Sequence, residues 1–118
     1  MRAEFEKELN KVEKAGSFFM DRVAKDFDKV VSAKIGDDSI ILKVNGSIGE
    51  VEVEICKEDG VWFVGDLDGN IAGNDGISYE RLYSLVGFSE RAFWNGKGRA
   101  RIKNMTRLAA MIQHGLTK

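Results

Sequence analysis

Cysteine and histidine are scarce in this sequence, and their scarcity excludes several classes of protein. Cys56 is the only cysteine among 118 residues, so no disulfide can close within the chain and a secreted disulfide scaffold is not expected. His114 is the only histidine, and one residue of each kind cannot build a His/Cys zinc site or a multi-histidine iron site. We expect Cys56 to be a buried or edge thiol, and His114 to complement a helix dipole.

Long apolar runs and phosphate-binding fingerprints are also missing. No apolar run approaches the roughly 18 residues that span a bilayer, and the charged segment 1–8 is unlike a signal peptide, so a cytoplasmic protein is expected. Neither glycine-rich phosphate-cradle motif occurs, and no spacing among the 19 acidic residues singles out a catalytic pair. We therefore expect a binding protein without cofactor or metal, rather than an enzyme.

The composition is that of an ordinary globular chain, with 43% hydrophobic and 31% charged residues, which favours a single domain. The expected fold class is α+β, with a long N-terminal helix packed on an antiparallel three- to four-stranded β-meander and followed by a small helical C-terminal cap. The expected boundaries are a helix over residues 1–30, a β-meander over 31–66, a glycine-rich loop over 67–77 and a basic helical cap over 78–118.

The N-terminal helix is predicted from apolar residues spaced by three, four or seven, which line one helical face. They are Phe5, Leu9, Val12, Phe19, Val23, Phe27 and Val30. Gly16-Ser17 is a weak point that costs about 1 kcal/mol. This stripe favours a helix that packs on the sheet of a monomer; the alternative is a dimer formed by a coiled coil of the N-terminal helices.

The meander is predicted from turn signals and alternating residues. Asn45-Gly46 is typical of a two-residue hairpin turn, which would pair Ile40 with Val51 and Leu42 with Gly49. That pairing places an apolar row on one face and an acidic, solvated row, Glu50, Glu52 and Glu54, on the other. Further turns are expected at Gly36-Asp37-Asp38 and at Glu58-Asp59-Gly60, with strands at 31–35 and 61–64.

The loop of residues 66–77 alternates Asp66, Asp68 and Asn70 as the first ligands of an EF-hand do. Ile71 and Ile77 stand where the turn glycine and the bidentate glutamate are required, so we expect a connector that holds no metal. Three helical elements are expected beyond it: Ser78 to Val86, a turn capped by Ser89 that reaches Trp94, and Met105 to His114 with Asn104 as its cap and Gly115-Leu116 as its stop.

Charge is distributed unevenly along the chain. Residues 1–86 carry 11 basic and 18 acidic side chains, whereas residues 87–118 carry seven basic side chains and one acidic. The seven are Arg91, Lys97, Arg99, Arg101, Lys103, Arg107 and Lys118. Such an asymmetry indicates that the C-terminal end is specialised for a negatively charged partner.

Two family resemblances fall on this basic end. The stretch Leu82-Tyr-Ser-Leu-Val-Gly87-Phe-Ser89, with Trp94 to Arg99, Ile102 and Arg107 to Ala109, resembles a helix-turn-helix of the Cro/repressor type over residues 78–114. The pattern Trp94-x-Gly96-x-Gly98-Arg99 is similar to the minor-groove loop of the histone-like nucleoid-structuring proteins. Both resemblances imply nucleic-acid binding.

The leading hypothesis is nucleic-acid binding, with Lys97, Arg99, Arg101 and Lys103 neutralising phosphates and Arg91 joining them. Three alternatives stay open. The chain could be an inhibitor or adaptor that docks on an acidic protein surface, or the basic residues could form a solvated face over a core that contains Phe93 and Trp94. A cystatin-like or NTF2-like ligand-binding fold has a similar order of helix and meander.

Overall fold

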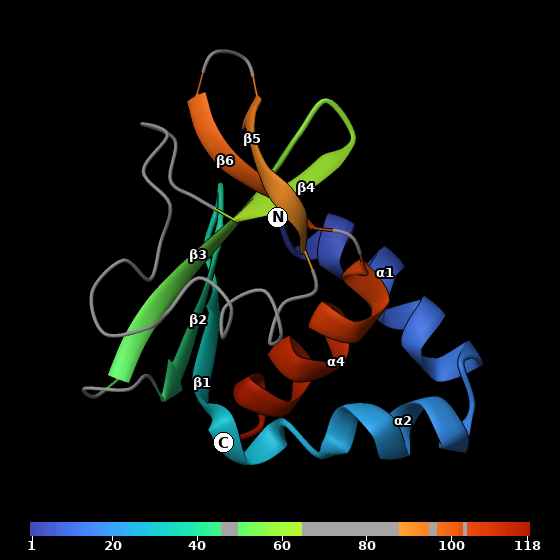
Figure 1. The fold of residues 1–118 in the computed structure, drawn as a ribbon. Coiled ribbons are helices and arrows are strands. Elements are labelled where there is room, and N and C mark those ends of the chain that lie inside the picture. The colour runs from blue at the N-terminus through green and yellow to red at the C-terminus, as the bar shows by residue number, and fades with distance from the viewer. Residues whose placement is uncertain (46–49, 65–87, 95–96, 103) are drawn as a thin grey trace.

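The structure is a computed structural model that describes residues 1–45, 50–64, 88–94, 97–102 and 104–118 (Figure 1). For Val51 and for the strand residues 88–94 and 97–100 it describes the backbone alone. The expected loop of residues 66–77 and the expected helix of residues 78–86 lie outside the described residues.

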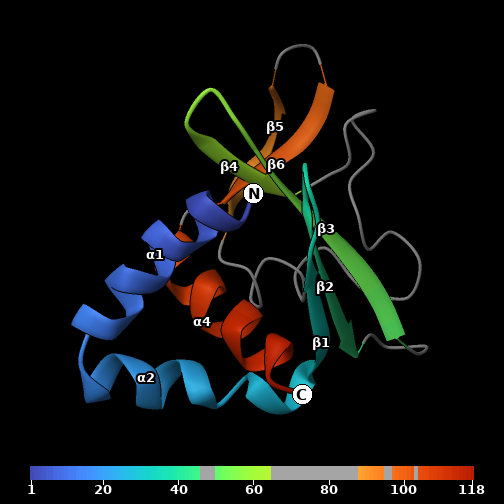
Figure 2. The same cartoon turned by 180° about the vertical axis from the view of Figure 1, so that it is seen from behind.

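The described chain forms one antiparallel sheet with helices on one side. The strands are β1 (Val30–Ile35), β2 (Ile40–Asn45), β3 (Glu50–Glu58), β4 (Val61–Val64), β5 (Phe88–Trp94) and β6 (Lys97–Ile102), in the spatial order β1-β2-β3-β4-β6-β5. Helices α1 (Arg2–Lys14), α2 (Ser17–Ala24) and α4 (Met105–Leu116) lie together on one side of the sheet in both views (Figures 1 and 2). The predicted α+β class is confirmed, although the sheet has six strands instead of three or four.

The N-terminal helix is broken where one continuous helix was predicted. Gly16 has φ +85°, a backbone conformation that suits glycine and ends helical geometry, so α1 stops at Lys14 and α2 starts at Ser17. A short 3₁₀ helix, η1 (Phe27–Lys29), then leads into β1. The predicted apolar stripe does face the core: Phe5, Val12, Val23 and Val30 are buried, and Leu9, Phe19 and Phe27 pack against them.

The helices form a layer with α4 at its centre. Helix α4 contacts β1 and β2, and α1 and α2 both pack against α4. Leu108 and Ile112 of α4 are fully buried in the same cluster as Ile40, Leu42 and Ile55 of the sheet. The apolar residues of α1 are thus buried within the chain's own core, with the C-terminal helix as their partner.

The register of the β2–β3 hairpin differs from the predicted one by four residues. Ile40 pairs with Ile55 and Asn45 with Glu50, so Asn45 ends a strand and four residues separate the two strands. The prediction of a two-residue turn at Asn45-Gly46 was therefore wrong. The predicted faces nevertheless hold, because side chains alternate with a period of two and a shift of four is even.

The two short turns of the meander are confirmed. Glu58 pairs with Val61, and the residues between them, Asp59 and Gly60, have φ of 52° and 79°, as a two-residue hairpin turn requires. The residues between β1 and β2 close with a hydrogen bond of 2.8 Å from the Gly36 N–H to the Ser39 carbonyl.

The segment from Phe88 to Trp94 is a strand, where a helical turn capped by Ser89 was predicted. Strand β6 pairs with β4, through Phe63↔Arg101 and Val64↔Ala100, and β5 pairs with β6. The physical reason is that β4 has a second edge whose backbone groups need partners, and an extended hairpin supplies them whereas a helix would not. The described part of the predicted helical cap is therefore a β-hairpin followed by α4.

Helix α4 begins as predicted. Asn104 is its N-cap, and the Asn104 Oδ1 accepts a hydrogen bond of 3.0 Å from the Arg107 backbone N–H. The helix continues through Gly115-Leu116, where a stop was expected. Gly115 has a packing role instead, because a Cβ at that position would lie 2.9 Å from the Cβ and the N of Ala33 on β1.

Candidate functional site

The β5–β6 hairpin forms the outer edge of the sheet at the end that points away from the helices (Figures 1 and 2). Its last described pair is Trp94↔Lys97, which leaves Asn95 and Gly96 between the strands. The pairs between β4 and β6 end at Val64↔Ala100, so Lys97 to Arg99 extend past the last described residue of β4. Lys97 to Arg99 thus lie beyond the described part of β4 with which β6 is paired.

Three of the five predicted site residues occupy alternate positions of β6. They are Lys97, Arg99 and Arg101, which we call the basic row. Alternate positions of a strand lie on one face of a sheet, and Arg101, whose side chain is described, is exposed. The row therefore places three positive residues along about 13 Å of one strand, because successive residues rise by about 3.3 Å.

The other two predicted site residues do not join the row. Arg91 on β5 pairs with Ala100, whose neighbour on β4 is the fully buried Val64, so the position of Arg91 is on the helix-bearing face of the hairpin. Arg91 and the basic row therefore do not share one face of the hairpin, because a strand alternates its faces with each residue. Lys103 lies outside the described residues.

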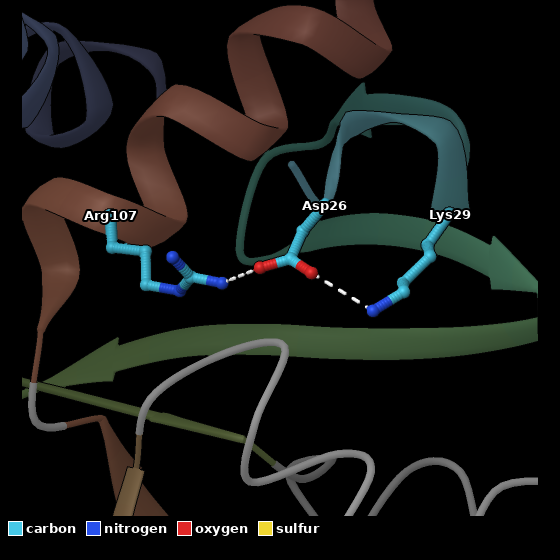
Figure 3. A network of polar contacts seen from close by, with 3 residues as sticks. All are labelled: Asp26, Lys29 and Arg107. Carbon is cyan, nitrogen blue, oxygen red and sulfur yellow. Dashed lines mark hydrogen bonds and ion pairs between the residues drawn. The ribbon is translucent and has the colours of Figure 1, made fainter. Parts of the chain in front are cut away.

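The last two basic residues of the C-terminal end are used within the fold. The Arg107 guanidinium donates to one oxygen of Asp26, and Lys29 Nζ lies 2.9 Å from the other oxygen (Figure 3). Partial burial by itself would raise the pKa of Asp26, but the hydrogen bonds from Lys29 and Arg107 outweigh it and lower this pKa. The Lys118 ammonium donates to the Val30 carbonyl oxygen. Arg107 thus connects α4 to the residue before η1, and Lys118 connects the C-terminal end to the start of β1.

Two other described surfaces are acidic. Glu50 and Glu52 on β3 are exposed, as the sequence predicted, and Lys43 Nζ lies 4.0 Å from Glu50. A surface hollow of about 390 Å³ beside the start of α1 is lined by four acidic residues, with one lysine. The acidic residues are Glu4, Asp37, Asp38 and Asp59. Both surfaces repel a polyanion, whereas the three basic positions of the row would attract one.

The described residues include the single cysteine and the single histidine of the chain. No three His, Cys, Asp or Glu side chains gather there as metal ligands would. Cys56 is buried in β3 opposite Phe63, and the His114 ring stacks on Phe27 with centroids 4.4 Å apart. Within the described part of the chain, no helix is long and apolar enough to cross a membrane.

Two features of this region were missed in the sequence. The sequence between β5 and β6 contains a hairpin-turn signal, Asn95-Gly96, which is the same dipeptide as Asn45-Gly46. Asp26 gave no signal, since its partner Arg107 lies 81 residues away in the sequence.

Comparison of the chain with protein-family models, with curated proteins and with solved structures found no match.

Proposed function

We propose that this protein is a non-enzymatic nucleic-acid-binding protein that contacts phosphates through the basic row of the β5–β6 hairpin. The observation that carries this proposal is the row itself. It comprises Lys97, Arg99 and Arg101 at alternate positions of β6, with Arg101 exposed.

The charge balance of the molecule supports the proposal. Phosphate contacts supply most of the affinity in non-specific binding, and they require cations on one accessible surface. Arg107 and Lys118 are held by Asp26 and by Val30, so they support the fold while the row remains as the basic surface. The acidic surfaces of β3 and of the hollow beside α1 confine a polyanion to the hairpin.

The salt dependence of binding tests the proposal. If the row neutralises three phosphates of a duplex, the plot of log affinity against log salt should have a slope of about −2.7, because each contact contributes about −0.9. Joint replacement of Lys97, Arg99 and Arg101 by Ala should reduce that slope nearly to zero. Fluorescence anisotropy with a labelled duplex measures both slopes.

A matched control separates the row from net charge. Lys7, Lys25 and Lys34 are exposed lysines on α1, after α2 and on β1, and their joint replacement by Ala removes the same charge. The control variant should retain most of the wild-type slope of log affinity against log salt. The proposal is wrong if the wild-type protein binds no nucleic acid at low salt, or if the two triple variants lose binding equally.

A further inference from the structure

We infer that Gly16 is a hinge at which two copies of this chain exchange α1, so that α1 of each copy packs on α4 of the other copy. The inference concerns the helical layer and does not rest on the proposed function. It follows from the conformation of the joint between α1 and α2, from the apolar face that the two helices share and from the length of α4.

A single residue separates α1 from α2. Ala15 keeps a helical backbone with φ −76° and ψ −19°, and α2 begins at Ser17, so Gly16 alone leaves the helical conformation, with φ +85° and ψ 168°. That conformation is accessible essentially to glycine alone. The two helices meet there at a corner on the outside of the molecule (Figures 1 and 2). A change in the backbone angles of Gly16 would therefore join α1 and α2 into one helix.

Straightening the joint offers partners to backbone groups at the break. The last carbonyls of α1 and the first N–H groups of α2 lie at helix ends, and no side chain of the described chain caps the start of α2. In a continuous helix these groups bond one another. Val12 and Phe19 are seven residues apart, so the apolar residues of both helices stay on one face. They are Phe5, Leu9, Val12, Phe19 and Val23.

The length of α4 determines how that face is covered. At about 1.5 Å per residue, the 12 residues of α4 span about 18 Å, whereas a helix from Arg2 to Ala24 would span about 35 Å. In the structure, the bend at Gly16 lets α1 and α2 pack on the same α4. A straight helix reaches past α4 and leaves the apolar face of α1 uncovered. A second copy that straightens in the same way covers it, because each α1 then packs on the α4 of the other copy.

Two variants shift the equilibrium in opposite directions. Gly16→Ala favours the straight helix, because alanine is preferred to glycine in a helix by a factor of about five, or about 1 kcal/mol. Ser17→Pro favours the bent chain, because proline suits the first position of α2 but removes a hydrogen bond from the middle of a continuous helix. Since two chains are affected, the dimerisation constant should rise at least about 25-fold for Gly16→Ala and fall at least about 100-fold for Ser17→Pro. Sedimentation equilibrium measures both changes.

Gly60→Ala is the matched control. Gly60 also has a positive φ, +79°, and no described atom lies within 4 Å of an added Cβ at either glycine, but Gly60 lies in the turn between β3 and β4. Gly60→Ala should leave the dimerisation constant unchanged. A Gly16→Ala variant that is unfolded or monomeric overturns the inference. An equal rise for Gly60→Ala, or a Ser17→Pro variant that dimerises as readily as the wild type, overturns it as well.

The contacts within the dimer distinguish exchange of α1 from a coiled coil. In an equal mixture of isotope-labelled and unlabelled Gly16→Ala chains, isotope-filtered nuclear magnetic resonance detects contacts between the two copies alone. Contacts between α1 and α4 should appear in these spectra. Contacts between the two α1 helices without any between α1 and α4 overturn the inference. The three substitutions lie outside the basic row, so their outcome leaves the proposed function to its own test.

Discussion

Asp26 connects two parts of the chain that are distant in sequence. Its carboxylate lies just before η1 and accepts hydrogen bonds from Lys29 of η1 and from Arg107 of α4 (Figure 3). The Asp26 side chain is only 17% exposed, so water screens these contacts less than it screens an ion pair on an open surface. Asp26 therefore ties the α2–η1 region to the beginning of the helix that packs on the sheet.

The lowered pKa of Asp26 predicts a dependence of stability on pH. A carboxylate whose pKa is lower in the folded state stabilises the fold above its unfolded pKa, about 3.9, and this contribution is lost as pH falls through the folded pKa. Asp26→Asn should lower the free energy of unfolding by about 1 kcal/mol at neutral pH. The difference between variant and wild type should shrink toward zero in strong acid. Urea denaturation over a series of pH values measures it.

Asp28 provides the control for that experiment. It is an exposed aspartate two residues away, within η1, and its replacement by Asn makes the same chemical change. Asp28→Asn should alter the pH dependence much less than Asp26→Asn. Identical pH profiles for the two variants would mean that the contacts with Lys29 and Arg107 contribute no stability.

At the scale of elements, the closest approach between helix and sheet is at Gly115. An added Cβ would lie 2.9 Å from two atoms of Ala33 and 3.0 Å from the carbonyl carbon of Ser32, so α4 or β1 would have to move. Gly115→Ala should therefore lower the free energy of unfolding by about 1–3 kcal/mol, the usual cost of overpacking. Chemical denaturation measures the loss. A gain of about 1 kcal/mol, which helix propensity alone predicts, would contradict this packing.

A second substitution locates the origin of that loss. Ala33→Gly removes one of the two atoms that the new Cβ would meet at 2.9 Å, while the backbone nitrogen of Ala33 stays in place. The double variant should therefore lose less than the sum of the two single variants. Strict additivity would place the effect of Gly115→Ala elsewhere.

The elements differ in how far the sequence predicts them. The alternation of apolar and polar residues within β2 and β3 predicts which face of the sheet each side chain occupies. This assignment holds despite an error of four residues in register, because a shift by an even number leaves every side chain on its face. The continuous N-terminal helix fails at Gly16, whose φ is +85°. Residues 88–94 have a serine suited to a helix cap, yet they form a strand because β4 offers an edge that β6 and then β5 extend. The edge of β4 exists only in the tertiary structure, so local secondary-structure propensity cannot predict it.

At the scale of the whole molecule, the basic residues of the C-terminal end divide between contacts within the fold and the basic row. The uneven charge along the chain predicts that the C-terminal end is specialised, but it counts Arg107 and Lys118 together with the others. Their contacts with Asp26 and Val30 require the folded chain, as does the separation of Arg91 from the basic row. The sequence thus predicts the charged region, and the strand pairing defines which of its residues share a face.

The most direct test of the central claim is a map of the backbone amides that respond when duplex DNA is added to the isotope-labelled protein. Nuclear magnetic resonance spectra recorded during a titration at low salt give this map residue by residue. If the basic row binds the duplex, the largest shift changes should fall on β5 and β6, and α1, β1 and β2 should change little. Largest changes on the acidic positions of β3 or on α1, or unchanged spectra at an excess of DNA, would contradict the claim that the hairpin binds nucleic acid.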